Sequence, residues 1–269
     1  MKPAILVAAL LFSGSVFAEC TEMDTWVWEE DSNQFGGGSL HTCGAYPADE
    51  SLRVISYHTW AENYGTGKQT LLWRVLLAKA DRPQVVASTN LRLWGGALID
   101  LDEEQIQDRF FIDKANYPLN DTTNAFAIRA DLGMNDYCQT LVRDQFVTLF
   151  VRQGDALKPV MKYLPLKQEL VTEGSPCSRE GYSKTLKGEG RLELLDTKTN
   201  GYRDLRLSTT AVLESYDEMA QESVDESAPG QWEESFKRET LQFDTVLKFD
   251  GHRYPVQWEA LPAKTWWQQ

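Results

Sequence analysis

Short runs of β-branched and leucine residues recur along the chain, and turn-forming residues separate them at nearly regular intervals. Before residue 115 the runs are Leu52–His58, Leu71–Lys79, Gln84–Thr89, Ala97–Leu101 and Arg109–Asp113, with the turn signals Gly65, Gly67, Pro83 and Gly95-Gly96 between them. Many short strands with regularly spaced turns are typical of β-sandwiches and barrels. The sequence therefore predicts an all-β, mostly antiparallel fold and disfavours an α/β fold.

Two later segments have the form of β-hairpins. In the first, a run over residues 146–153 reaches Gly154-Asp155 and returns over 157–164. In the second, a run over 241–249 reaches Asp250-Gly251 and returns over 252–256. An Asp-Gly pair supplies the positive φ angles of a type I′ turn. We therefore expect a hairpin at each place.

The first 18 residues have the order of a cleavable signal peptide. Lys2 precedes an apolar run from Ala4 to Phe12, and the small residue Ala18 ends the segment. We expect cleavage between Ala18 and Glu19 and a periplasmic or secreted protein. The sequence as a whole is similar to many uncharacterised periplasmic proteins of Gram-negative bacteria.

The remainder of the chain is expected to form an arm, two β lobes and a linker. Residues 19–51 carry eight acids and no Lys or Arg, which predicts an acidic N-terminal arm. Residues 52–165 and 190–269 predict two sandwich- or barrel-like lobes, and the turn-rich residues 166–189 predict a linker between them. Residues 214–239, with nine acids against two basic residues, predict a small helical or loop excursion.

The charge balance excludes several classes of partner. The chain has 40 acidic and 27 basic side chains and a formal net charge of −13. Such a surface repels nucleic acid and anionic membranes. After the signal peptide no apolar run approaches the ~18 residues that a membrane span requires. We therefore expect no nucleic-acid partner and no membrane span.

The four cysteines predict disulfides. Cys20, Cys43, Cys138 and Cys177 allow three pairings, and an exported protein meets an oxidising compartment. Pairing of sequence neighbours gives Cys20–Cys43 and Cys138–Cys177, each contributing roughly 3 to 4 kcal/mol by loop entropy. No CxxC spacing occurs, which disfavours redox catalysis and a structural zinc site.

One segment of ten residues, 196–205, has the spacing of a calcium loop. Asp196, Asn200 and Asp204 occupy three of the four ligand positions around Gly201. The segment resembles the calcium loop of FG-GAP repeats, known from integrin-type β-propellers, but Lys198 occupies the third ligand position. An ammonium group there opposes a divalent ion, so no metal is expected. The alternative interpretation is an ordinary Asx turn between strands.

Other catalytic templates are incomplete. Gly65-Thr66-Gly67-Lys68 resembles part of a phosphate loop, but Glu62 and Gln69 occupy the glycine and hydroxyl positions that the motif requires. Neither GxSxG nor HExxH occurs. Of the histidines, His58 lies in a predicted strand that could hold a base, and the alternative is a packed side chain. We predict no catalytic residue and no cofactor.

The nine tryptophans suggest a binding function. Trp73 and Trp94 lie in apolar runs and are expected in the core, whereas Trp232, Trp266 and Trp267 have polar or terminal surroundings. Exposed aromatics anchor sugars and proteins, although Trp266 and Trp267 could instead pack on the second lobe.

The candidate binding residues are Trp232, Trp266 and Trp267 with the adjacent acids Glu233 and Glu234. The first hypothesis is an exported non-enzymatic binding protein, an inhibitor or immunity-type partner of a basic cell-envelope enzyme, with attraction between opposite charges. The alternative is an envelope polysaccharide- or peptidoglycan-binding protein. The third hypothesis is a hydrolase with an unrecognised site.

Overall fold

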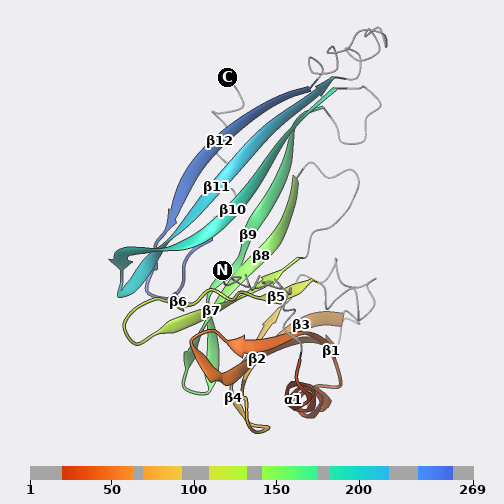
Figure 1. The fold of residues 1–269 in the computed structure, drawn as a ribbon. Helices are drawn as coiled ribbons and strands as arrows, with labels where there is room; N and C mark the ends of the chain where they lie inside the picture. The colour runs from red at the N-terminus through yellow and green to blue at the C-terminus, as the bar shows by residue number, and fades with distance from the viewer. Residues whose placement is uncertain are drawn as a thin grey trace, which may run out of the picture.

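The protein is built on β-strands. A computed structural model describes residues 20–62, 69–92, 109–131, 141–174, 182–217 and 236–256. In these residues one helix and twelve strands are formed (Figure 1): α1 (Glu22–Asn33), β1 (Ser39–Tyr46), β2 (Asp49–Glu62), β3 (Gln69–Lys79), β4 (Val85–Arg92), β5 (Phe110–Ile112), β6 (Tyr117–Pro118), β7 (Asn124–Ala130), β8 (Leu141–Gln153), β9 (Ala156–Gly174), β10 (Tyr182–Thr199), β11 (Tyr202–Asp217) and β12 (Phe236–Leu247). The prediction of an all-β fold is confirmed.

All twelve strands belong to one sheet. Its main path runs β1-β2-β3-β4-β9-β10-β11-β12, while β8 pairs with β9 and β7, and β7 pairs with β5 and β6. Every pairing is antiparallel except a short parallel contact between β4 and β9. The shorter strands curl into a barrel-like body at one end, and β9–β12 extend from it as long curved strands (Figure 1).

Two large apolar clusters fill the fold, and β7, β8 and β9 contribute residues to both. Successive side chains of a strand point to opposite faces. On β8, Phe150 therefore packs in the cluster around Trp73, whereas Leu149 packs with Leu205 and Leu207 of β11. Trp73 is fully buried, as expected for a core residue.

The segment expected to be a linker is largely strand. Residues 166–174 continue β9, and residues 182–189 begin β10. Of its glycines, Gly174 has φ +77° at the end of β9, and Gly188 lies within β10. A Cβ on Gly190 of β10 would lie 2.7 Å from Leu207 Cδ1. At Gly190, just beyond the expected linker, glycine thus lets a neighbouring side chain approach closely rather than marking a turn.

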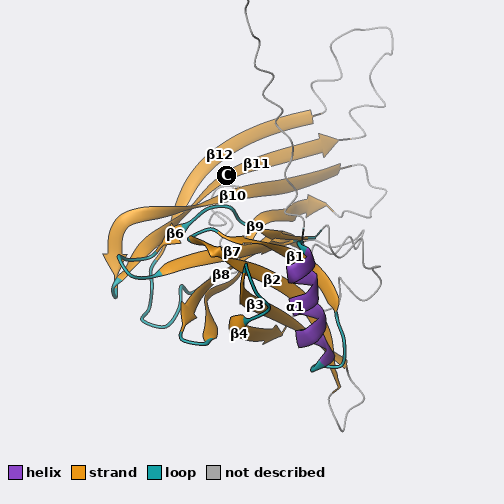
Figure 2. Cartoon of the chain, turned by 60° about the horizontal axis from the view of Figure 1, so that its bottom comes forward, coloured by secondary structure: helices purple, strands orange, loops and turns teal. Residues whose placement is uncertain are grey.

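The acidic N-terminal arm contains regular secondary structure. It forms α1, which lies against β1–β3 (Figure 2). The helix begins with a capping box, in which the Thr21 side chain accepts from Asp24 N and the Asp24 carboxylate accepts from Thr21 N. Thr-x-x-Asp is the sequence signature of such a start, so the signal for the helix was present in the sequence.

The hairpin predictions have different outcomes. The β8–β9 hairpin is confirmed, with Gly154 at φ +66° in its turn. At the second site Gly251 has φ +98°, but β12 already ends at Leu247 and residues 252–256 form no strand. The prediction of a second hairpin was therefore wrong. Instead, Asp250 Oδ1 accepts from two backbone N–H groups in an Asx turn, and Tyr254 N donates to Val160 O at 2.6 Å.

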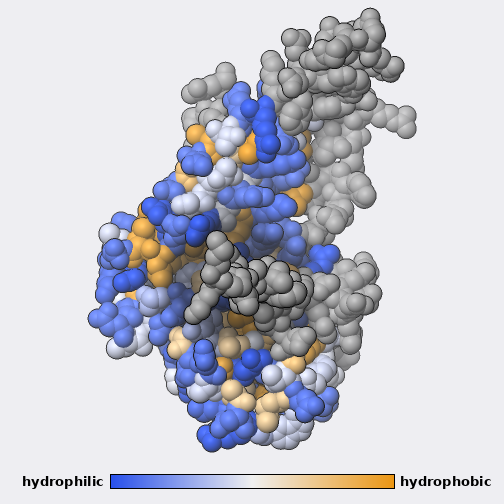
Figure 3. All heavy atoms as spheres, viewed as in Figure 1, coloured by the Kyte–Doolittle hydropathy of each residue, from blue (hydrophilic) through white to orange (hydrophobic). Residues whose placement is uncertain are grey.

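The long strands form an amphipathic sheet. One face carries the leucines and Ala211 of the second and fourth apolar clusters. The other carries cross-strand ion pairs, including Arg206–Glu193 at 2.6 Å and Lys187–Glu214 at 2.7 Å. In Figure 3 the view over β10–β12 is mainly hydrophilic, with some hydrophobic residues at the margin. Alternation along each strand produces this division.

Candidate functional site

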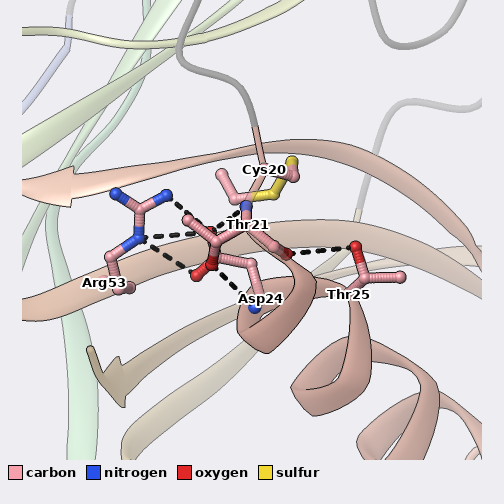
Figure 4. Close-up of a disulfide and its surroundings, with 6 residues drawn as sticks. Cys20, Thr21, Asp24, Thr25 and Arg53 are labelled. Atoms are coloured by element: carbon pink, nitrogen blue, oxygen red, sulfur yellow. Dashed lines mark hydrogen bonds and ion pairs between the residues drawn. A yellow bond between two sulfur atoms is a disulfide. The ribbon is translucent and has the colours of Figure 1, made fainter. Parts of the chain in front are cut away.

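Helix α1 is held at its first turn by a disulfide. Cys20 pairs with Cys43 of β1, with 5.1 Å between the Cα atoms (Figure 4). This confirms one of the two predicted disulfides. Cys43 is fully buried beneath the helix, beside Val27 and Ile55. The disulfide therefore joins the start of α1 to the sheet on which it packs.

An ion pair reinforces the same end of the helix. Asp24 accepts from Arg53 Nε at 3.0 Å and from Arg53 Nη2 at 2.5 Å (Figure 4). Asp24 also forms half of the capping box, and it is buried. Bidentate geometry of this kind is the strong form of an Arg–carboxylate contact. The charge of Asp24 is thus compensated within the fold.

A second buried ion pair fixes the other end of α1. Asp31 accepts from Arg74 Nε, from Arg74 Nη2 at 2.8 Å and from the Tyr57 hydroxyl at 2.5 Å. Arg74 also donates to Asn90, and its guanidinium lies 4.2 Å from the centre of the Phe35 ring. Burial and the Asp31 carboxylate raise the pKa of Tyr57 far above its ordinary value. Tyr57 is therefore a neutral hydrogen-bond donor at every physiological pH.

Arg74 keeps its charge despite this burial. Desolvation by itself lowers the pKa of the guanidinium, but the hydrogen bonds and charge of Asp31 outweigh it and raise the pKa above the ordinary value. Two of the acids in the N-terminal segment, Asp24 and Asp31, are consequently structural. They add nothing to an outward negative field.

The outer face of α1 presents an aromatic ring among carboxylates. Trp26 is 48% exposed, and Glu22, Glu29 and Glu30 are also exposed. Side chains at i, i+4, i+7 and i+8 share one face of a helix. We call the set Glu22, Trp26, Glu29 and Glu30 the α1 face. Its carboxylates have no cation in the last turn of the helix to balance them.

The described ends of the acidic segment 214–239 lie away from α1. The ends of β11 and β12 that flank residues 218–235 lie at the end of the molecule opposite α1 (Figure 1). Of their acids, Glu214 pairs with Lys187 at 2.7 Å and lies 3.8 Å from Arg238. These described acids therefore do not extend the α1 face.

The histidine proposed as a possible base lies in the core. His41 Nε2 and His58 Nδ1 are 2.7 Å apart, and the His41 ring stacks on Phe110. His41 is the extra residue of a β-bulge, which turns its side chain into the core. Ser56 Oγ accepts from Trp73 Nε1 at 2.7 Å and lies 3.4 Å from His41 Nδ1.

These groups form a buried polar chain rather than an accessible catalytic site. Ser56 is fully buried and His41 is 2% exposed. Burial first, and the neighbouring His58 second, hold the pKa of His41 well below its ordinary value. His41 is therefore neutral at pH 7. A Ser56 hydroxyl that accepts from Trp73 can donate to His41 Nδ1, which places the His41 proton on Nε2.

The residues of the calcium-like segment form the turn of the β10–β11 hairpin. Asn200 and Gly201 both have positive φ, +49° and +85°, as a type I′ turn requires. Asp204 is buried and accepts from the Thr197 hydroxyl at 2.7 Å. Asn200 Nδ2 donates to Phe249 O at 2.8 Å.

The charged members of this segment point away from one another. The Asp196 carboxylate is fully exposed and 3.9 Å from Arg203 Nη2, and Lys198 Nζ lies 3.7 Å from Asp121 Oδ1. The hairpin keeps the turn but does not gather the carboxylates of the FG-GAP pattern. Over the described residues, no three His, Cys, Asp or Glu side chains are grouped as metal ligands.

Several predicted residues lie outside the described part of the chain. They are the signal peptide, Trp94, Cys138, Cys177, Trp232, Glu233, Glu234, Trp266 and Trp267. Within the part that is described, no helix has the length and apolar character to cross a membrane. Comparison with models of known protein families, with curated proteins and with solved structures gave no match.

Proposed function

We propose that this protein is an exported, non-enzymatic binding protein that uses the α1 face to bind a basic protein of the cell envelope. The observation that carries the proposal is Trp26, half exposed on a helix whose outer side also presents Glu22, Glu29 and Glu30. A partner with this complementarity would be a basic envelope enzyme, which the protein would inhibit or neutralise.

The anchoring of α1 supports a binding role. The disulfide and the two ion pairs hold the helix at both ends against the sheet. A rigid helix loses little conformational freedom on association, so more of the contact energy is retained as affinity. Tryptophan is the residue type most enriched at binding hot spots, where truncation costs about 2 kcal/mol or more.

The carboxylates would act mainly on the rate of encounter. Charges of opposite sign steer two proteins together, and salt screens this attraction. Trp26 would act mainly on the rate of dissociation, because most affinity differences within one interface arise there. The two contributions can be separated by kinetics.

The test begins by cross-linking the mature protein to partners in an envelope extract at low salt. A purified candidate is then measured against two matched triple variants. Glu22→Gln/Glu29→Gln/Glu30→Gln neutralises the α1 face, whereas Asp121→Asn/Asp155→Asn/Glu189→Gln removes the same charge from exposed sites elsewhere. We expect the first variant, and not the second, to associate at least tenfold more slowly at low salt.

Trp26→Ala should leave the association rate nearly unchanged and raise the dissociation rate about thirtyfold, the equivalent of about 2 kcal/mol. If both triple variants associate as the wild type does, the α1 face is not the binding site. If the protein is retained on purified peptidoglycan and salt does not weaken this retention, the polysaccharide alternative is supported instead. Stacking of tryptophan on a sugar involves no charge.

A further inference from the structure

Strand β12 forms an edge of the sheet. It pairs with β11 in unbroken register from Phe236 opposite Tyr216 to Leu247 opposite Leu205. Among the described strands it has no other partner, and it lies at the margin of the sheet in both ribbon views (Figures 1 and 2). The outer side of an edge strand presents a row of backbone donors and acceptors that can pair with another chain.

Over the described residues, this edge lacks several of the features that usually prevent pairing. Its twelve residues contain no proline, and no bulge interrupts their pairing with β11. Short length, proline and bulges are the common protections of exposed edges. The remaining protection is charge, and on β12 the charges have both signs. Like charges on a partner strand would repel, whereas a suitable register would bring opposite charges together.

We propose that two copies of this chain associate through β12, antiparallel, about a two-fold axis at Leu241. An antiparallel pair about a two-fold axis is self-complementary, so each contact occurs twice. With the axis at Leu241, Arg238 of each copy lies opposite Asp244 of the other. The ion-pair face and the leucine face of the sheet then continue across the interface, because residues of equal parity are paired.

Neighbouring registers lack this complementarity. An axis at Gln242 places Arg238 opposite Val246 and leaves both Arg238 and Asp244 without an opposite charge. An axis at Phe243 places Arg238 opposite Lys248, and directly opposed like charges are destabilising. An axis at Thr240 places Arg238 opposite Gln242. Among these four registers, charge therefore favours the axis at Leu241.

The two charged side chains retain capacity for a partner. The Arg238 side chain is 61% exposed, and its Nε lies 3.8 Å from Glu214 Oε1, which is long for an ion pair. The Asp244 side chain is 53% exposed; its Oδ1 accepts from Ser208 Oγ at 2.7 Å, while its Oδ2 lies 3.9 Å from Arg206 Nη1. In the proposed dimer, Val246, which is 47% exposed, lies opposite the position of Phe236. The proposal is independent of the function assigned to α1, which lies far from this edge.

Cross-linking tests the register. Leu241→Cys places two thiols opposite each other at the axis, where paired side chains approach closely enough for a disulfide. Val246→Cys is the matched control, since its two copies would lie about ten residues apart, or ~33 Å along the strands. We expect a covalent dimer from Leu241→Cys alone. Equal cross-linking of both variants, or none of either, would overturn the proposal.

Charge reversal tests the complementarity. Light scattering during size exclusion should give twice the chain mass for the wild type. Arg238→Asp should weaken the dimer about tenfold or more, and Arg238→Asp/Asp244→Arg should restore it. Melting curves of each variant identify any loss of folding. A wild type that is monomeric at all concentrations, or a dimer that is indifferent to Arg238→Asp, would contradict pairing through β12.

Discussion

Asp31 of α1 and Arg74 of β3 are 43 residues apart in sequence and form a two-point ion pair between the helix and the sheet. Both side chains are only 10% exposed. The Tyr57 hydroxyl also donates to Asp31, and Arg74 also donates to the Asn90 side chain. Asp31 counts toward the negative charge of the sequence, but in the folded protein it belongs to the interior.

Removing one partner of this pair should be strongly destabilising. Asp31→Asn leaves the Arg74 guanidinium buried without its counter-ion, and we expect a loss of about 3 kcal/mol in the free energy of unfolding. The exposed neighbour Glu30→Gln is the control and should change stability by less than ~0.5 kcal/mol. Urea denaturation measures both. A loss below about 1 kcal/mol for Asp31→Asn would show that Arg74 is solvated in the folded protein.

The buried histidines should make stability depend on pH. Because the pKa of His41 in the folded protein lies below its ordinary value, the unfolded chain binds a proton that the folded protein does not. Stability is therefore fully present above about pH 6.5, the unfolded pKa, and falls with decreasing pH until the folded pKa is reached. The slope should approach 1.4 kcal/mol per pH unit within that window.

Two variants test the origin of this slope. His41→Gln should flatten the dependence of unfolding free energy on pH between 6.5 and 5, whereas the exposed His252→Gln should leave it unchanged. Urea denaturation across this range supplies the measurement. A slope that persists in His41→Gln would assign the proton to another group.

The disulfide should stabilise α1 more than the distant strands. Cys20 and Cys43 are separated by 23 residues, and a loop of this size predicts about 3 kcal/mol. In the variant Cys20→Ser/Cys43→Ser, hydrogen exchange of α1 amides should accelerate, because no covalent link then restrains local opening of the helix. The amides of β10 and β11 are the internal control. Equal acceleration throughout the chain would mean that α1 and the sheet unfold as one unit.

The sequence predicted much of the sheet because strands reveal themselves locally. The apolar runs that contain Trp73 and Phe150, and the turn at Gly154, follow from residue type and spacing alone. The His41–His58 contact could not be predicted, because it depends on a bulge in β1 and on the register between two strands. Nor could the burial of Asp31, whose partner Arg74 belongs to a strand far along the chain. Composition gives the number of charges, whereas tertiary pairing decides which of them remain outside.

Calcium should not stabilise the protein, although residues 196–205 have most of a calcium-loop pattern. Asp196 faces solvent, Asn200 donates to a backbone carbonyl, and Lys198 lies near Asp121, so the ligand oxygens do not converge. A site with a dissociation constant of about 0.1 mM would add about 1.4 kcal/mol in 1 mM calcium and raise the melting temperature by a few degrees. We expect identical melting temperatures in calcium and in chelator. A rise that disappears in Asp204→Asn would mean that the loop rearranges around the ion, with Lys198 turned outward and the buried Asp204 carboxylate as a ligand.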